Sequence, residues 1–556
     1  MKRTAEKYRF VMAGAPLIFL AIFYFYPLTK ICLLGFAPGG SWPPMTLGRF
    51  LEGPYFGILG FTFWQAVLST VLTLAAAMPG AYVMSRFAFR GKGWVNILST
   101  VPFVLPTVVT AAAFRALLGP RGLVNEGLMA LLDLEAPPVR IDRTLWFFLL
   151  AHVFYNYALV LRIVGGLWAR INPEVRAAAR MLGASPWKTF RLVTLPLLAP
   201  AIGSAAMLVF IFCFTSFGVV LILGGPGYAT LEVEIYRQAV QLFNLPVAAV
   251  LSLLQIGVNF ALLWTYAWLG KRTAVSFYPD SESAPRRRPR SAGEKLLVGA
   301  NLGFMALLLG APLAALVARS LVTETGLSPL YYLALFQQQA RSVFSSPPAG
   351  AALNSAGFAL AATCLALALG LLASVYLASP KGRLASVLDA VFMLPLATSA
   401  VTLGFGYIVA LNRPPLNLRD SLALVPLAHA LVAFPFVVRC LLPTLRSIPH
   451  QLREAAVMLG ASPFQTWRRI DAPMAGRALL AGAVFAFSVS MGEFGASSFV
   501  TRPHTPTMPV AIFRFLGQPG DLNYGQAMAM STLLMAVTAA GFVLLEKLRT
   551  GPLGEL

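Results

Sequence analysis

Stretches of about twenty predominantly apolar residues recur along this chain, and a helix of that length spans the hydrocarbon core of a bilayer. These windows lie near residues 9–29, 58–84, 94–118, 144–167, 193–223, 246–269, 296–318, 351–378, 385–411, 421–444, 473–500 and 525–545. The pattern predicts an all-α polytopic membrane protein with twelve transmembrane helices. An even number of spans places both termini on the same side of the membrane.

Charged residues make up only 12% of the chain. A soluble chain carries about a quarter, so this density excludes a soluble enzyme and a disordered chain. The four cysteines, Cys32, Cys213, Cys364 and Cys440, lie in or at the edge of apolar windows, with no Cys-x-x-Cys pair among them. We therefore expect no disulfide, no metal site and no cofactor. No A-x-A cleavage site follows the first window, which predicts an uncleaved first helix.

The lysine and arginine residues indicate the orientation, since cytoplasmic loops hold the excess of positive charge. With the N-terminus inside, 28 of the 43 bases fall in cytoplasmic segments. Both termini are therefore expected in the cytoplasm. The formal net charge of +22 is explained by this topology, so no nucleic-acid partner is expected.

One polar segment, residues 271–295, separates the sixth window from the seventh. It predicts a first half at 1–270 and a second half at 296–556, each with six spans, joined by a cytoplasmic linker. The RRRPR run within the linker either binds anionic membrane lipid or is a plain charged connection.

The two halves are copies of one another. MLGASP occurs at 181–186 and again at 458–463, a shift of 277 residues. The same shift superimposes further pairs: His152 on His429, Arg162 on Arg439, Arg176 on Arg453, Phe217-Gly218 on Phe494-Gly495, and 230–237 on 507–514. Upstream, Leu105-Pro106 matches Leu394-Pro395 at a shift of 289, which predicts about 12 extra residues between the third and fourth spans of the first half. Because each copy has an even number of spans, the repeat is parallel rather than inverted.

The repeated MLGASP segment predicts a paired-helix elbow on the cytoplasmic side. Its alanine-rich stretch favours a short helix, and Gly183 and Gly460 suit a left-handed cap at the end of that helix. The Ser-Pro that follows matches the N-cap and first residue of a second short helix. Small alanine side chains let another surface approach closely, so we interpret each elbow as a docking surface for a partner; an interfacial helix without a partner is the alternative.

Glu454-Ala455-Ala456, followed by Gly460 and then by Pro473, resembles the EAA coupling loop of ABC-importer permeases with the type I fold. The resemblance covers residues 170–191 and 446–472, one loop in each half. It implies that each loop docks on one of two copies of a cytoplasmic ABC ATPase, through the coupling residues Ala177, Ala178, Ala179, Gly183, Pro186, Glu454, Ala455, Ala456, Gly460 and Pro463. Ala177 stands where the second copy has Glu454, which predicts a weaker or asymmetric contact in the first half.

No phosphate-binding loop is present in the sequence. Neither Gly91-Lys92-Gly93 nor Gly270-Lys271-Arg272 has the G-x-x-x-x-G-K-[ST] spacing. No nucleophile, base or paired-carboxylate arrangement stands out either, so we expect no catalytic residue in this chain. Hydrolysis of ATP is expected from a separate chain.

Glu493 is the clearest charged residue within an apolar window, and the shift of 277 pairs it with Ser216. Two interpretations stay open. One is a substrate path lined by Thr215, Ser216, Glu493, Phe217 and Phe494, because a charge in the membrane is tolerated where it faces protein or water. The other is a buried structural hydrogen bond near a helix break. His152 and His429 occupy one repeated position, which favours a hydrogen bond that orients the fourth span over a pH switch.

The outward segments after each fifth span share the repeat register. We predict that they receive an extracytoplasmic solute-binding protein, through Tyr236, Arg237, Phe513 and Arg514.

Residues 213–239 and 149–157, with SVSMGEFG in the second half, resemble fused permeases for thiamine. Fused ferric iron permeases share this architecture, and another small solute is the third alternative. Glu493 suits a cation of either kind. The resemblance implies ATP-driven alternating access by a permease subunit in the bacterial inner membrane. An ion-coupled secondary transporter is the alternative from another class.

Overall fold

The computed structural model describes residues 12–36, 53–272, 287–323, 326–338, 344, 346–378, 383–412, 414 and 416–549. The basic N-terminal residues 1–11, most of the predicted linker (273–286) and Lys381 lie outside the described residues.

Ten described helices are long and apolar enough to cross a membrane. They are Met12–Phe36, Pro54–Arg86, Leu145–Arg170, Pro186–Phe214, Leu245–Trp268, Ala292–Leu321, Gly350–Ala378, Leu424–Ser447, Phe464–Gly492 and Asp521–Leu545. The third window of each half forms a bent pair instead, with a bend of 107° in the first half and 92° in the second. If each bent pair is one span, the total is the predicted twelve.

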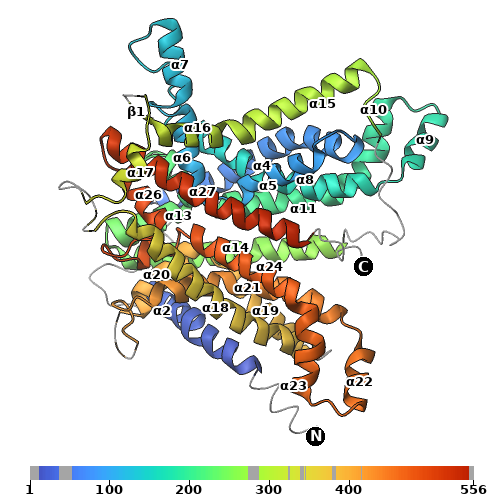
Figure 1. The fold of residues 1–556 in the computed structure, drawn as a ribbon, viewed down its shortest axis with the longest axis vertical. Helices are drawn as coiled ribbons and strands as arrows, with labels where there is room; N and C mark the ends of the chain where they lie inside the picture. Colours follow the sequence, from blue (N-terminus) through green and yellow to red (C-terminus); the bar gives the residue numbers. More distant parts are fainter. Residues whose placement is uncertain are drawn as a thin grey trace. The chain divides into compact units, whose positions relative to one another are not determined.

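The elements of the first half run through the colours from blue to green in Figure 1. They are η1 (Ala21–Phe25), α2 (Tyr26–Phe36), α4 (Pro54–Arg86), α5 (Lys92–Val104), α6 (Thr107–Leu118), α7 (Leu123–Leu132), α8 (Leu145–Arg170), α9 (Pro173–Met181), α10 (Pro186–Thr189), η2 (Phe190–Thr194), α11 (Leu195–Phe214), α12 (Gly218–Leu223), α13 (Leu231–Tyr236), η3 (Arg237–Gln241) and α14 (Leu245–Arg272). The η elements are single π-helical turns within or beside longer helices.

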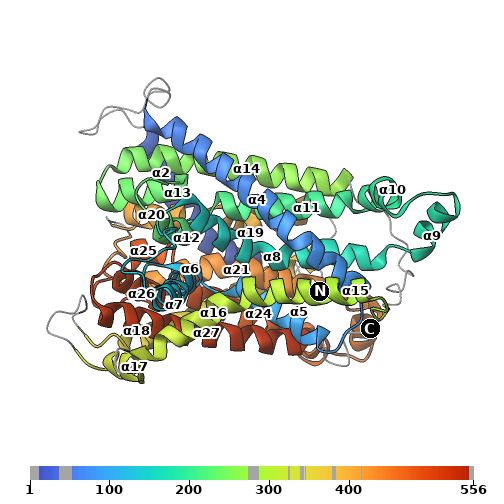
Figure 2. The ribbon, with the colours of Figure 1, turned by 90° about the horizontal axis from the view of Figure 1, so that it is seen from above.

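The second half continues to the red C-terminal end. Its elements are α15 (Ala292–Met305), η4 (Ala306–Gly310), α16 (Ala311–Leu321), β1 (Val322–Thr323), β2 (Gly326–Leu327), α17 (Leu330–Ala334), α18 (Gly350–Ala378), α19 (Arg383–Ala397), α20 (Ala400–Ala410), α21 (Leu424–Ser447), α22 (His450–Met458), α23 (Pro463–Thr466), η5 (Trp467–Asp471), α24 (Ala472–Gly492), α25 (Ser497–Val500), α26 (Met508–Leu516) and α27 (Asp521–Arg549). Figure 2 shows α15 running on into α16 as one rod. β1 and β2 pair antiparallel, Val322 with Leu327 and Thr323 with Gly326.

Local chemistry explains the two bends. Leu105 has extended backbone angles between α5 and α6, as expected before Pro106, whose ring disfavours a helical preceding residue. In the second half Ser399 caps α20 by accepting a hydrogen bond from the N–H of Val401 at 3.1 Å. Each bend therefore begins a new half-helix, which a side chain caps in the second half only.

The duplication extends to element boundaries, with one correction. α9 and α22 begin 277 residues apart, as do η2 and η5. Upstream, α6 and α20 begin 293 residues apart rather than the expected 289, and this register pairs Pro102 with Pro395, each inside a helix. The first half therefore has 16 extra residues rather than about 12, and this stretch contains α7. The leucine-proline match was misleading because two residues carry little register information.

The chain packs into two compact units that differ from the two sequence halves. One comprises Met1–Met45, Ile235–Ile256 and Pro329–Leu556, and the other Thr46–Glu234 and Gly257–Ser328. In the first of these units α2 packs on α20, and the Tyr24 hydroxyl lies 2.7 Å from Thr398 Oγ1. In the other, α16 packs on α6, and Arg319 of α16 pairs with Glu126 of α7. The opening span of each half thus packs in the unit that holds the later spans of the other half.

The fourth span of each half, α8 or α21, is the most buried long helix of its unit. Of its most apolar window, 72% is buried in α8 and 67% in α21. Small residues let neighbouring helices approach it: a Cβ on Gly80 of α4 would overlap the Tyr157 hydroxyl, and one on Gly370 of α18 would lie 2.5 Å from Val437. These fourth spans position the polar networks described below.

Candidate functional site

The first elbow consists of α9 and α10, which project from their unit beyond the ends of α8 and α11 (Figure 2). Asn172 caps α9 by accepting a hydrogen bond from the N–H of Glu174 at 2.9 Å. The helix ends at Gly183, whose φ is +82°, and the N–H of Ala184 donates to Ala179 O at 3.1 Å. This is the pattern of a glycine-terminated helix. Ser185 then caps α10.

The second elbow, α22 with α23, repeats the same geometry in the other unit (Figure 1). Gly460 also has a φ of +82°, and the N–H of Ala461 donates to Ala456 O at 2.9 Å. Ser462 accepts a hydrogen bond from the N–H of Gln465. The predicted left-handed glycine cap and serine N-cap are therefore confirmed in both halves.

Large apolar side chains at the turn of each elbow are open to solvent. The exposed fractions are 89% for Met181, 88% for Leu182, 87% for Met458 and 88% for Leu459. We call each Met-Leu pair an elbow tip. Such exposure on a protrusion is unusual for apolar side chains of this size and is typical of a surface that meets another protein.

The base of each elbow is held by an aromatic pair. Trp187 stacks on Phe190 at 5.7 Å between ring centroids in the first half, and Phe464 stacks on Trp467 at 6.2 Å in the second. The tryptophan and the phenylalanine exchange places between the copies, so the pair is retained although its members differ.

The second elbow has an ion pair that the first cannot form. Arg453 Nε of α22 donates to Asp471 Oδ1 of η5 at 2.8 Å. The matching residues in the first half are Arg176 and Thr194, and a threonine carries no charge. Arg176 Nε is buried without a hydrogen-bond partner among the described residues. The two elbows are therefore braced differently.

The predicted coupling residues lie on the open sides of the elbows. Ala177, Ala178, Gly183, Pro186, Glu454, Ala455 and Gly460 are exposed, and Ala179 and Ala456 are half-buried. The side chain of Pro463 lies outside the described residues. Glu454 Oε1 lies 2.9 Å from His450 Nδ1, one helical turn away.

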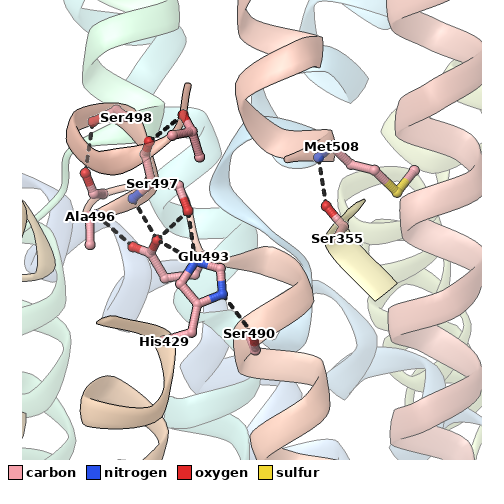
Figure 3. A network of polar contacts seen from close by, with 10 residues as sticks. Ser355, His429, Ser490, Glu493, Ala496, Ser497, Ser498 and Met508 are labelled. Atoms are coloured by element: carbon pink, nitrogen blue, oxygen red, sulfur yellow. Dashed lines mark hydrogen bonds and ion pairs between the residues drawn. The ribbon is translucent and has the colours of Figure 1, made fainter. Parts of the chain in front are cut away.

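Glu493 follows the last residue of α24 and is engaged on both carboxylate oxygens (Figure 3). Oε1 accepts from the N–H of Ala496 at 2.8 Å, and Oε2 accepts from the N–H of Ser497 at 2.8 Å and from its hydroxyl at 2.7 Å. The side chain is 5% exposed. This geometry matches the second interpretation of Glu493, a buried hydrogen bond near a helix break.

His429 of α21 completes this network. Its Nε2 lies 3.4 Å from Glu493 Oε2 and 2.8 Å from Ser497 Oγ, and its Nδ1 lies 2.8 Å from Ser490 Oγ (Figure 3). The imidazole therefore ties the fourth span to both sides of the break after the fifth span.

His152 instead links the fourth span of the first half to α4 and to the break after α11, and both of its partners are neutral. Nδ1 lies 2.8 Å from Ser69 Oγ of α4, and Nε2 lies 2.9 Å from Ser216 Oγ. Ser216 occupies the position of Glu493 in the repeat. The predicted orienting hydrogen bond of the fourth span is thus present in both copies, although its partners differ.

The other residues of the predicted substrate path are mostly packed within their units. Phe217 is 6% exposed and Phe494 3% exposed, while Thr215 is half-buried and donates to Ile211 O at 2.9 Å.

The residues predicted to dock a binding protein differ in exposure. Tyr236 is buried, and that burial raises the pKa of its phenol while the neighbouring Arg514 lowers it. Arg237 is exposed, and Phe513 and Arg514 are half-buried.

A repeated anchor holds both segments that were predicted to face outward, and sequence reasoning missed it. The N–H of Leu231 donates to Thr62 Oγ1 at 3.0 Å, and the N–H of Met508 donates to Ser355 Oγ at 2.7 Å (Figure 3). Thr62 and Ser355 are related by the upstream shift of 293 residues. That register, with a hydroxyl retained in both copies, was the available signal.

The chain matches one family model twice. The model, described as "Binding-protein-dependent transport system inner membrane component", covers residues 73–275 and 366–548.

Three relatives match most of the chain. The thiamine transport system permease protein of Brucella abortus is 27% identical over 86% of this chain and 85% of that relative. The corresponding protein of Salmonella typhimurium is 28% identical over 92% of each. A ferric transport system permease protein of Actinobacillus pleuropneumoniae is 25% identical over 96% of this chain and 77% of that relative.

Among solved structures, a chain of a bacterial alginate ABC transporter is 16% identical. It covers 47% of this chain and 93% of its own length, with a TM-score of 0.40.

Proposed function

This chain belongs to the family of inner membrane components of binding-protein-dependent transport systems, and from that premise we propose that its two halves together form the translocation path of an importer for thiamine or a closely related compound. It is a multi-pass transporter subunit. The observation that carries the proposal is the pair of elbows, which present the same apolar tip from each half.

Each elbow is proposed to dock on one copy of a cytoplasmic ABC ATPase. The exposed Met-Leu pair supplies apolar area, and the glycine cap holds it at the apex. Each elbow lies between the fourth and fifth spans, so that movement of an attached ATPase shifts both helices. This linkage supports ATP-driven alternating access, with ATP hydrolysed by the separate chain.

The choice of thiamine rests on the relatives rather than on Glu493. Thiamine permeases match this chain over nearly their full length, whereas the ferric permease has further sequence beyond the match. Glu493 offers a cation little, because its oxygens already accept hydrogen bonds from Ala496 and Ser497. A ferric importer is the second candidate, because the ferric permease matches 96% of this chain.

The proposed topology places both termini and both elbows in the cytoplasm and the segments at 231–241 and 508–516 outside. An extracytoplasmic solute-binding protein is proposed to meet Arg237, Phe513 and Arg514. Tyr236 is buried, so we propose that it packs under that surface and does not contact the binding protein itself.

The proposal is tested by reconstituting the purified chain with its cognate ATPase and binding protein in proteoliposomes and measuring uptake of labelled thiamine and of Fe³⁺. We expect thiamine uptake that requires ATP. Uptake driven by an ion gradient without ATP would establish the secondary-transporter alternative, and uptake of Fe³⁺ alone would establish the ferric one.

Variants of the elbow tips separate docking from folding. Met458→Ser combined with Leu459→Ser should release the ATPase during purification while the chain remains monodisperse, because these side chains are 87% and 88% exposed. Leu480→Ser, an exposed leucine on α24 away from the elbow, is the matched control. Retention of the ATPase by the tip variant would overturn the docking assignment.

A further inference from the structure

Basic residues of the linker lie against the end of α4. Residues 287–290, which we call the linker strap, are the described part of the RRRPR run. The N–H of Ala88 donates to Arg287 O at 2.9 Å, and the N–H of Arg287 donates to Arg86 O at 3.2 Å. The Arg287 guanidinium also lies over the Phe87 ring, 5.4 Å from its centroid. The strap is therefore fixed to the protein and is not a loose charged connection.

The helices at this junction are packed together. Val83 and Phe87, at the end of α4, form a buried apolar cluster with Val298 of α15. Lys92, the first residue of α5, donates hydrogen bonds to Met84 O and Phe87 O. The end of α4 and the starts of α5 and α15 therefore form one packed junction, at the same end of the unit as the first elbow (Figure 2).

Three guanidinium groups at the junction lie close enough for their charges to interact. Arg287 and Arg180, which belongs to α9 of the first elbow, both repel Arg86. Glu294 attracts Arg86, but its carboxylate already pairs with Arg287, whose two terminal nitrogens donate to it at 2.5 and 3.3 Å. Within the described part of the chain, neither Arg86 nor Arg180 forms an ion pair of its own. The junction therefore holds more positive charge than its acid balances.

The two key arginines belong to the first half alone. The shift of 293 places Ser379 at the position of Arg86, and the shift of 277 places Val457 at the position of Arg180. The second elbow is held by the ion pair described above, which the first elbow cannot form. An anion bound between Arg86 and Arg180 would hold the first elbow in place of that ion pair.

Exposed apolar side chains near these arginines indicate that the anion is a lipid. Trp94 and Leu98 share one side of α5 and are 67% and 62% exposed, and Leu296 near the start of α15 is 73% exposed. Tryptophan is enriched where a membrane meets water, and basic clusters at the cytoplasmic ends of spans attract anionic lipids. A phospholipid matches this surface, because its phosphate pairs with guanidinium groups and its acyl chains cover the apolar side chains. A free phosphate would leave those side chains uncovered.

We propose that Arg86 and Arg180 bind the phosphate of an anionic phospholipid of the cytoplasmic leaflet, and that this lipid braces the first elbow against its unit. Arg287, oriented by Glu294, adds positive charge to the site. The lipid site goes beyond the proposed function and does not depend on which solute is carried. Loss of the lipid should loosen α9 and α10 and leave α22 and α23 unchanged.

A photoactivatable phosphatidylglycerol tests the location of the site. The purified full-length chain is reconstituted in phosphatidylcholine nanodiscs that contain this probe, and crosslinked peptides are mapped by mass spectrometry. We expect crosslinks within residues 86–98 or 287–297, and competition by unlabelled phosphatidylglycerol but not by inorganic phosphate. Competition by inorganic phosphate would identify a free anion and overturn the lipid assignment. Absence of crosslinks from both segments would overturn the location.

Charge variants test the two ligands. Arg86→Gln combined with Arg180→Gln should lower crosslinking at these segments by about tenfold or more, whereas Arg86→Lys combined with Arg180→Lys should keep most of it. Arg468→Gln combined with Arg469→Gln, at two exposed arginines of the second elbow region, is the matched control for the change in net charge. Unchanged crosslinking in the first glutamine pair, or an equal loss in the control, would overturn the assignment of Arg86 and Arg180.

Hydrogen exchange tests the bracing, with the second elbow of the same molecule as internal control. Nanodiscs of phosphatidylcholine alone are compared with nanodiscs that also contain phosphatidylglycerol. We expect the anionic lipid to slow exchange of the amides at 173–189 but not at 450–466, and the Arg86→Gln and Arg180→Gln pair to abolish the slowing. Equal slowing in both elbows, or none in the first, would contradict bracing by a bound lipid. Neither measurement needs solute or ATP, so failure of thiamine uptake would contradict the proposed function and leave the lipid site standing.

Discussion

The Nε2 atom of His429 lies 3.4 Å from the Oε2 atom of Glu493, so the fourth and fifth spans of the second half meet through an imidazole and a carboxylate. In the first half the equivalent histidine, His152, bonds to the hydroxyl of Ser216 instead. The carboxylate also accepts hydrogen bonds from the backbone N–H groups of Ala496, the N-cap of α25, and of Ser497, its first residue. The pair therefore fixes the geometry of the break that follows the fifth span.

The first prediction follows from this arrangement. Glu493→Ala leaves two buried N–H groups without a hydrogen-bond acceptor, and each costs about 1 to 3 kcal/mol of folding free energy. The apparent melting temperature of the detergent-purified chain should therefore fall markedly. Ser216→Ala should lower the melting temperature less, because the Ser216 hydroxyl bonds to His152 and does not accept backbone N–H groups as the Glu493 carboxylate does. A Glu493→Ala protein with wild-type melting behaviour but weakened solute uptake would favour the substrate-path interpretation instead.

The second prediction concerns the elbow glycine. Gly460 has a φ of +82°, and a Cβ added to it would meet no atom within 4 Å, so Gly460→Ala introduces backbone strain of about 1 to 2 kcal/mol without a clash. We expect reduced ATPase retention and reduced ATP-dependent uptake with normal membrane insertion. Gly476→Ala in α24 also meets open space but has no positive φ, and it should behave as wild type. Equal behaviour of the two variants would show that the cap does not matter for coupling.

The third prediction compares the two copies of the coupling helix. Glu454 is exposed and lies beside His450, whereas Ala177 occupies its place in the first half. Glu454→Lys reverses an existing charge, so it should weaken ATPase binding and uptake more than Ala177→Lys. Both are measured by ATPase retained on the tagged permease and by initial uptake rate. Equal loss at the two positions would contradict the predicted asymmetry.

The fourth prediction concerns orientation. In a variant without native cysteines, Gln451→Cys on α22 should react with a membrane-impermeant maleimide only from the cytoplasmic side. Gln518→Cys, after α26, should react only from outside. Both residues are exposed, so accessibility depends on the side of the membrane alone. Labelling of Gln451→Cys in intact cells would contradict the proposed topology and indicate the opposite orientation.

Features set by local chemistry or by hydropathy were predictable from the sequence. The apolar windows became long helices because a segment in lipid must satisfy its own backbone hydrogen bonds. The elbows ended at Gly183 and Gly460 because a left-handed residue without a Cβ carries little strain there. The duplication was readable because the same spacing recurs over hundreds of residues.

Tertiary structure decided which apolar surfaces meet each other. Lipid-facing and protein-facing positions are equally apolar in a membrane helix, so hydropathy did not reveal that α2 packs with α20 and α16 with α6. For the same reason it did not show that the fourth spans are the most buried long helices of their units. Glu493 was recognisable as a charge in an apolar window, but its partners come from the helix break and from α21. Ala496 and Ser497 are local donors, but only the folded chain brings His429 to the carboxylate, because contacts between distant segments depend on packing rather than on local sequence.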